Sequence, residues 1–159
     1  MHGIIPLLFA FLCALSVLAR DLYWVAMNEN EVAQQIVDSA LRVHTALGPG
    51  LLESVYQAAL AYELEKRGLR VSRQQAIPVI YEAIRIDTGF HADLVVENKV
   101  IVEIKSVETV APVHKKQLLS YLKLADKRLG LLINFNVVLF KNGITRIVNR
   151  LPEDPSQRR

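Results

Sequence analysis

Three charged side chains interrupt an otherwise apolar stretch, residues 91–107, which reads HADLVVENKVIVEIKSV. They are Asp93, Glu103 and Lys105. Carboxylate oxygens are the ligands that Mg²⁺ takes in proteins, and a lysine ammonium beside them could orient or help deprotonate a water molecule and stabilise negative charge. The three residues therefore predict a site for a divalent cation, provided that the fold brings them together.

Their spacing predicts that they meet across a β-hairpin. Two apolar runs rich in β-branched residues, 94–96 and 100–104, flank a turn at residues 97–99. Alternation then puts Glu103 and Lys105 on one face of the second strand. If the residues at 96 and 100 pair, Asp93 falls directly opposite Glu103.

A pair of facing carboxylates in a buried sheet requires a compensating cation. At about 4–5 Å and an effective dielectric constant of about 20, two carboxylates repel each other by about 3–4 kcal/mol. The repulsion therefore predicts a divalent cation, with Asp93 and Glu103 as ligands and Lys105 beside it. The backbone carbonyl of Ile104 is a further candidate ligand.

A third carboxylate, Glu53, is predicted in the first turn of a helix. A periodicity of 3.6 residues predicts one helix over residues 28–47, begun by a capping box at Asn28, and a second helix over residues 51–67, after Gly-Pro-Gly at 48–50. Helical spacing aligns Glu53 with the apolar stripe of the second helix, which favours a role in the site. Alternatively, the negative charge of Glu53 only stabilises the helix by interacting with its dipole, an effect of about 0.3–1 kcal/mol.

The remaining pattern predicts an α/β fold in which helices flank a mixed central β-sheet. Residues 71–81 read as a strand near a sheet edge, because Pro78 cannot donate to a ladder. A helix from Pro112 to about residue 127 precedes the apolar run 129–135. Strand, helix and strand in this order imply a crossover connection and a central strand buried on both faces.

Two shorter features complete this part of the pattern. Residues 137–140 and 144–148 are expected to form a hairpin, because Asn-Gly stands between them. His91 is two residues before Asp93 and is expected on the same strand face, as a structural histidine or as a ligand or substrate contact.

Length and composition indicate one domain. A chain of 159 residues with 52% apolar residues can bury a sizeable core and is not a disordered protein. The net charge of +3 is only mildly basic, so binding of a polyanion would depend on local patches. The single cysteine, Cys13, excludes an internal disulfide and a cysteine-based zinc site, and favours a reducing compartment.

The N-terminus contains an uncharged apolar run, residues 4–19, which is short for a membrane span and of the size of a signal-peptide core. No lysine or arginine precedes it, and Met27 stands directly before the first predicted helix. We expect residues 1–26 to lie outside the fold, either as an upstream mis-start or as a true signal or anchor. A folded domain is expected over 27–150 and a disordered tail over 151–159. The predicted location is the cytoplasm, without membrane contact for the folded domain, and export or membrane attachment is the alternative.

Several blocks of the sequence resemble those of a known nuclease superfamily. Asp93 followed by Glu103-Ile104-Lys105 is similar to the active-site pattern of the PD-(D/E)XK nucleases, although Ala92 stands where that pattern has proline. Gly50-Leu-Leu-Glu53-Ser-Val-Tyr56 resembles the motif that names the GxxExxY protein family, a branch of that superfamily. Blocks at 117–121 and 130–135 fit the same family, and the resemblance covers about residues 29–149.

This resemblance implies a PD-(D/E)XK nuclease-like core and a Mg²⁺- or Mn²⁺-dependent nuclease acting on DNA. Glu53 becomes a third active-site carboxylate that binds the metal directly or through water. Gln117 and Tyr121 resemble a Q-x-x-x-Y motif that helps to hold the site and the DNA strand, while Lys115 and Lys116 would contact phosphates. On the residues alone, Tyr121 reads as core packing and the lysines equally well as a solvated face.

Two other functions remain open at this point. One is a nucleic-acid-binding or assembly module of the same fold that relies on a protein partner for activity, and a homodimer is compatible with either reading. The other is an unrelated enzyme or a membrane-tethered scaffold, in which the charged hairpin is a structural ion cluster.

Overall fold

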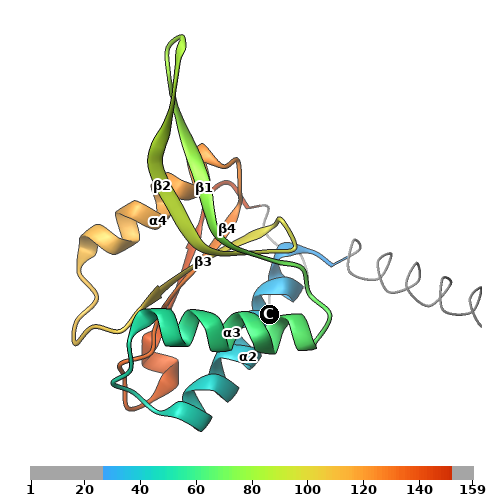
Figure 1. The fold of residues 1–159 in the computed structure, drawn as a ribbon, viewed down its shortest axis with the longest axis vertical. Coiled ribbons are helices and arrows are strands. Elements are labelled where there is room, and N and C mark those ends of the chain that lie inside the picture. Colours follow the sequence, from blue (N-terminus) through green and yellow to red (C-terminus); the bar gives the residue numbers. More distant parts are fainter. Residues whose placement is uncertain (1–26, 152–159) are drawn as a thin grey trace, which may run out of the picture.

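The computed structural model describes residues 27–151, with a five-stranded sheet at their centre. The strands lie in the order of the chain: β1 (Val71–Tyr81), β2 (Ile84–Val96), β3 (Val100–Lys105), β4 (Leu129–Asn134) and β5 (Ile144–Val148). Strands β3 and β4 are parallel, and all other neighbours are antiparallel. The helices are α2 (Glu29–Leu47), α3 (Glu53–Lys66), α4 (Pro112–Leu124) and a short 3₁₀ helix, η1 (Phe140–Gly143). The predicted α/β architecture with a mixed sheet is confirmed (Figure 1).

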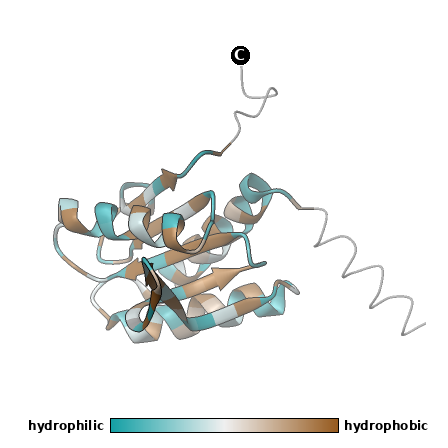
Figure 2. Cartoon of the chain, turned by 90° about the horizontal axis from the view of Figure 1, so that it is seen from above, coloured by the Kyte–Doolittle hydropathy of each residue, from teal (hydrophilic) through white to brown (hydrophobic). Residues whose placement is uncertain are grey.

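Helices α2 and α3 cover one face of the sheet, and α4 covers the other (Figures 1 and 2). Every residue of β4 and the first five residues of β3 are buried between these layers. The side chains of β3 alternate as expected, because Val102 and Ile104 pack toward α2 and α3 while Ile101 packs toward α4. Glu103 and Lys105 are in phase with Ile101, so they belong to the α4 side of the sheet.

The predicted hairpin and crossover are both present. Val96 pairs with Val100, and the ladder continues to Leu94 and Val102. Glu97 and Asn98 each have a φ of 53°, the positive value that both central positions of a type I′ turn need. Helix α4 then carries the chain across one face of the sheet to β4, which lies beside β3.

The helix boundaries follow local capping chemistry. The backbone N–H of Glu31 donates to Asn28 Oδ1 over 3.0 Å, and that of Asn28 donates to Glu31 Oε2 over 2.7 Å, which completes the predicted capping box. Helix α3 begins at Glu53 rather than at residue 51. Helix α4 ends at Leu124 rather than near 127, and Asp126 beyond it has a φ of 49°, outside the helical region.

The predicted strand at residues 137–140 is wrong. Its last residue, Phe140, begins the 3₁₀ helix η1, and β5 pairs with β4 instead. A Cβ added to Gly143 would lie 2.2 Å from the carbonyl oxygen of Asn134, so this glycine lets η1 pack against the end of β4. Phe140 is buried there, with its ring 5.3 Å from that of His44. The Asn-Gly pair therefore makes a tight packed turn rather than a hairpin loop.

Strands β1 and β2 extend past the rest of the sheet as a two-stranded ribbon, and β1 is an edge strand as Pro78 predicts (Figure 1). Within this ribbon the regular alternation of side chains between the two faces of the sheet is interrupted, which we call a phase change. On β2, Ala92 packs on the α4 side, whereas Leu94, two residues later, packs on the α2 and α3 side. On β1, Ile77 and Val71 likewise pack on opposite sides, although their spacing is even. Regular alternation would keep each pair on one face, so both strands must rotate between these positions.

Among residues 27–151, no helix is both long and apolar enough to cross a membrane. The apolar run at 4–19 and residues 152–159 of the predicted tail lie outside the described residues.

Candidate active site

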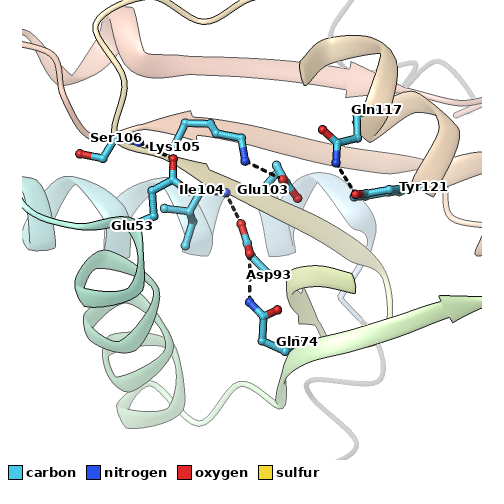
Figure 3. Close-up of polar contacts among 9 residues, drawn as sticks. All are labelled: Glu53, Gln74, Asp93, Glu103, Ile104, Lys105, Ser106, Gln117 and Tyr121. Carbon is cyan, nitrogen blue, oxygen red and sulfur yellow. Dashed lines mark hydrogen bonds and ion pairs between the residues drawn. The ribbon is translucent and has the colours of Figure 1, made fainter. Parts of the chain in front are cut away.

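The site is built around the end of β3, where Glu103 and Lys105 lie side by side. Their side chains are only 6% and 14% exposed, and Lys105 Nζ donates to Glu103 Oε1 over 2.9 Å (Figure 3). The other carboxylate oxygen, Glu103 Oε2, is buried and has no hydrogen-bond partner among the described residues. An unsatisfied buried carboxylate oxygen is costly, so this atom marks a place where a further cationic or donor group is needed.

Burial raises the pKa of the Glu103 carboxyl above its usual value. The hydrogen bond from Lys105 opposes this shift, but the negative charges of Asp93 and Glu53 add to it. Asp93 and Glu53 are therefore both close enough to Glu103 to repel its negative charge. The free energy of ionising Glu103 would fall if a metal cation lay beside it.

The pKa of Lys105 is also raised, although burial alone would lower it. The hydrogen bond to Glu103 and the negative charges of Glu103, Glu53 and Asp93 outweigh the burial. The pairing thus has the larger effect on the pKa of Lys105, whereas burial has the larger effect on the pKa of Glu103. Lys105 is a protonated ammonium at neutral pH in the metal-free protein.

Asp93 lies on β2, but its carboxylate does not simply face Glu103 across the ladder. Pairing stops at Leu94 and Val102, one pair before Asp93 and Glu103. Instead, Asp93 Oδ2 accepts the backbone N–H of Ile104 over 2.8 Å, and Oδ1 accepts a bond from the Gln74 side chain over 3.1 Å (Figure 3). The phase change of β2 at this residue turns its carboxylate toward the backbone of β3.

Glu53 reaches the same end of β3 from the first turn of α3. Its Oε1 accepts the backbone N–H of Ser106 over 3.0 Å, and the Ser106 hydroxyl donates to the carbonyl of Leu51 over 2.6 Å. The glutamate and the loop before it are thus tied to the residue that follows Lys105. Glu53 lies within electrostatic reach of Glu103 and Lys105.

Tyr56 holds the loop from which Glu53 projects. Its side chain is fully buried, with the ring stacked on Phe135 at a centroid distance of 4.4 Å. The hydroxyl donates to the Gly48 carbonyl over 2.6 Å and accepts the N–H of Leu51 over 3.1 Å. Gly50 in this loop has a φ of 99°, which L side chains rarely adopt. The Gly50, Glu53 and Tyr56 block therefore forms one local structure that fixes a carboxylate.

Gln117 and Tyr121 form a pair on α4. Gln117 Nε2 donates to the Tyr121 hydroxyl (Figure 3). The Tyr121 ring packs against that of Phe90, with centroids 5.0 Å apart. Burial raises the pKa of the Tyr121 hydroxyl, and the charges of Glu103 and Asp93 act on it in the same direction. Tyr121 is thus a core residue whose polar end lies near the carboxylates.

Lys115, Lys116 and His91 lie at the surface. Both lysines are exposed in the first turns of α4, and neither forms an ion pair with a residue of the described range. His91 is exposed on β2. The expectation that His91 shares a face with Asp93 assumes regular alternation, which the phase change at Asp93 interrupts.

The sequence reasoning missed three side-chain amides that organise this site. Gln74 binds Asp93 Oδ1, and Gln57 donates to the Asp93 backbone carbonyl over 2.8 Å. Asn134 is buried at the end of β4 beside Lys105; it donates to the carbonyl of Val107 over 2.7 Å and accepts the Val107 N–H over 3.1 Å. The position of Asn134 at the end of an apolar run is a sequence feature that could have indicated a structural role. The polar sequence around Gln74 contains no such feature.

The donor set suits a hard divalent cation. Within residues 27–151, no three His, Cys, Asp or Glu side chains are arranged so that they could hold a metal ion by themselves. Mg²⁺ in phosphoryl-transfer sites, however, needs only one or two protein carboxylates, and it fills its other positions with water and substrate oxygens. The free, buried Oε2 of Glu103 and the adjacent Asp93 meet that smaller requirement.

One comparison with known protein families gives a match to this chain. A family model described as the PD-(D/E)XK nuclease superfamily matches residues 30–147, from the first residues of α2 to the end of β5. Neither the curated proteins nor the solved structures contain a match to the chain. The matched region includes Asp93, Glu103 and Lys105 and covers well over half of the 159 residues. The chain therefore belongs to the PD-(D/E)XK nuclease superfamily.

Proposed function

We propose that this chain is a Mg²⁺-dependent nuclease that hydrolyses phosphodiester bonds of DNA, and that it belongs to the GxxExxY branch of the superfamily. Nucleases of this superfamily generally use divalent metal ions. The observation that carries the proposal is the buried Oε2 of Glu103, which has no hydrogen-bond partner in the part of the chain that the structure describes. It lies beside a protonated Lys105 and within reach of the charge of Asp93.

Asp93 and Glu103 would hold the metal through carboxylate oxygens, with the backbone carbonyl of Ile104 as a further donor. When bound, Mg²⁺ supplies charge neutralisation at the phosphate and lowers the pKa of a bound water. Glu103 also keeps Lys105 charged and in place through the 2.9 Å contact. Asp93 is oriented by the backbone of β3, so the two ligands are fixed by neighbouring strands.

Lys105 would act through its positive charge. Its raised pKa leaves it protonated at neutral pH, which suits an ammonium that orients water and stabilises charge developing on the phosphate. A protonated lysine cannot accept a proton, so the lysine takes part in deprotonating water only after it has first lost its own proton.

Glu53 would contact the metal site through water. One of its oxygens already accepts the Ser106 N–H, and this bond anchors the start of α3 to the end of β3. The remaining oxygen can receive a water molecule without displacing that bond.

Helix α4 would contact the substrate. The Gln117 and Tyr121 pair lies beside the carboxylates, and Lys115 and Lys116 on the same helix carry positive charges that form no ion pair within residues 27–151. Lysines in such positions bind the phosphate backbone without reading its sequence. This arrangement favours a polyanionic strand as the substrate.

Assignment to the GxxExxY branch is supported by the structural role of its motif in this chain. Gly50 supplies a positive φ, Glu53 reaches the end of β3, and Tyr56 holds the intervening loop. Each of the three named positions thus has a physical reason for its residue type.

The test is a cleavage assay on the full chain with single-stranded DNA, double-stranded DNA and RNA. Cleavage should require Mg²⁺ or Mn²⁺ and stop when EDTA is added. Cleavage of RNA alone would contradict the proposed substrate. Absence of any cleavage by a folded chain that binds Mg²⁺ would favour the partner-dependent binding module instead.

A further inference from the structure

The point where the β1 and β2 ribbon changes phase is occupied by Gln74 and Asp93. The flanking positions are paired, Arg73 with Leu94 and Gln75 with Ala92, while Gln74 has a φ of 47° in the middle of a strand. Left-handed backbone is unfavourable for a residue with a side chain, and glutamine has no special tolerance for it. Such strain persists where the surrounding structure compensates it, and it is frequent at functional sites.

The compensation at Gln74 is a hydrogen bond to the candidate metal ligand. Gln74 Nε2 donates to Asp93 Oδ1 over 3.1 Å, while the other oxygen, Oδ2, accepts the N–H of Ile104 (Figure 3). Gln57 also donates to the backbone carbonyl of Asp93. Strands β1 and β3 and helix α3 therefore all fix this one residue.

We propose that Gln74 is a positioning residue that orients the Asp93 carboxylate for the metal ion, an inference that rests on the proposed metal-dependent function. Donors behind a ligating carboxylate fix its orientation, and their loss typically weakens metal affinity about 10- to 100-fold. A neutral amide is suited to this task, since a lysine or arginine at the same place would neutralise Asp93 and compete with the metal. The left-handed backbone of Gln74 is retained because it aims the amide at Asp93.

Two substitutions separate positioning from a general effect on the fold. Gln74→Leu keeps the size of the side chain and the unfavourable backbone but removes the donor. Gln74→Gly removes the donor as well but relieves the backbone, because glycine accepts a positive φ. A positioning role requires both variants to lose metal affinity by a similar factor, although Gln74→Gly should unfold at a higher temperature than Gln74→Leu.

Gln75→Leu is the matched control. Gln75 is the next residue on the same strand, is exposed, and forms no side-chain hydrogen bond to a residue of the described range. The same change of residue type there should leave metal affinity and cleavage unaltered.

The experiment measures Mn²⁺ affinity by calorimetry without DNA, thermal unfolding in EDTA, and DNA cleavage at saturating metal, on the full chain and all three variants. We expect about 10- to 100-fold weaker Mn²⁺ binding in both Gln74 variants and parent-like binding in Gln75→Leu. If the parent binds Mn²⁺ and cleaves DNA while Gln74→Leu binds as tightly as Gln75→Leu, the role of Gln74 is overturned and the proposed function stands. If affinity instead follows the unfolding temperature across the series, Gln74 is merely structural. A parent that binds no Mn²⁺ would refute the metal site and this inference with it.

Discussion

Lys105 Nζ lies 2.9 Å from Glu103 Oε1, while the other oxygen of that carboxylate is buried without a partner in the described part of the chain. Lys105 thus provides a hydrogen bond to only one of the two carboxylate oxygens of Glu103. The pairing keeps Lys105 charged, yet burial still makes ionised Glu103 unfavourable in the metal-free protein. This arrangement should lower the free energy of unfolding of the metal-free protein by a measurable amount.

Glu103→Gln should stabilise the metal-free protein at neutral pH. The folded-state pKa of Glu103 is raised above 4.5, so its contribution to stability is present below pH 4.5 and is lost as the pH rises through the raised value. Each unit of that shift corresponds to about 1.4 kcal/mol. In EDTA, Glu103→Gln should therefore unfold at a higher temperature than the parent, and the difference between the two unfolding temperatures should grow as the pH rises above 4.5. A difference that shrinks as the pH rises would contradict the direction of the shift.

Asp93→Asn should abolish stabilisation by metal while preserving the fold. Asparagine retains an oxygen that can accept the Ile104 N–H but lacks the negative charge that a divalent cation needs. At a Mn²⁺ concentration 100 times the dissociation constant, the parent should gain about 2.7 kcal/mol of unfolding free energy. The variant should gain little, and Asp38→Asn, on the exposed face of α2, should gain as much as the parent. Equal gains in all three proteins would place the metal elsewhere.

Tyr56→Phe should lower activity by more than its effect on stability explains. The ring can still stack on Phe135, but the bonds to Gly48 and Leu51 are lost, at a cost of about 1 kcal/mol. Because that loop carries Glu53, kcat should fall at temperatures where the variant is fully folded. Tyr62→Phe, which changes an exposed tyrosine on the same helix, is the control. Unchanged kcat in Tyr56→Phe would restrict the motif tyrosine to a structural role.

Lys115→Ala and Lys116→Ala should weaken DNA binding in a salt-dependent way. Each phosphate contact that is lost should reduce the slope of log affinity against log salt by about 0.7–0.9. Binding measured in EDTA, where cleavage is prevented, gives this slope directly. Lys66→Ala, at the far end of α3, should leave it unchanged. Identical slopes in all the proteins would show that α4 carries only a solvated face.

The features predicted correctly from the sequence are those that local pattern determines. Two β-branched runs around a short turn predict the pairing of Val96 with Val100, because the turn residues between them set the register of a hairpin. A buried strand, a helix and another buried strand leave a crossover as the ordinary connection, and β3, α4 and β4 follow it.

The features that sequence could not supply depend on contacts between distant segments. The change in side-chain alternation at Gln74 and Asp93 depends on the left-handed backbone of Gln74. No pattern of residue types predicts this conformation for a glutamine. Asn-Gly at 142–143 is a strong hairpin signal, but the close approach of Gly143 to Asn134 assigns it to a 3₁₀ turn.

The most direct test of the central claim is single-turnover DNA cleavage by the full chain and its Lys105→Ala variant at saturating Mg²⁺, with Lys66→Ala as control. The account predicts cleavage by the parent and the control, and a rate lower by orders of magnitude in Lys105→Ala, while that variant stays folded and still binds metal. Cleavage by Lys105→Ala at the parent's rate would contradict the assignment of this site.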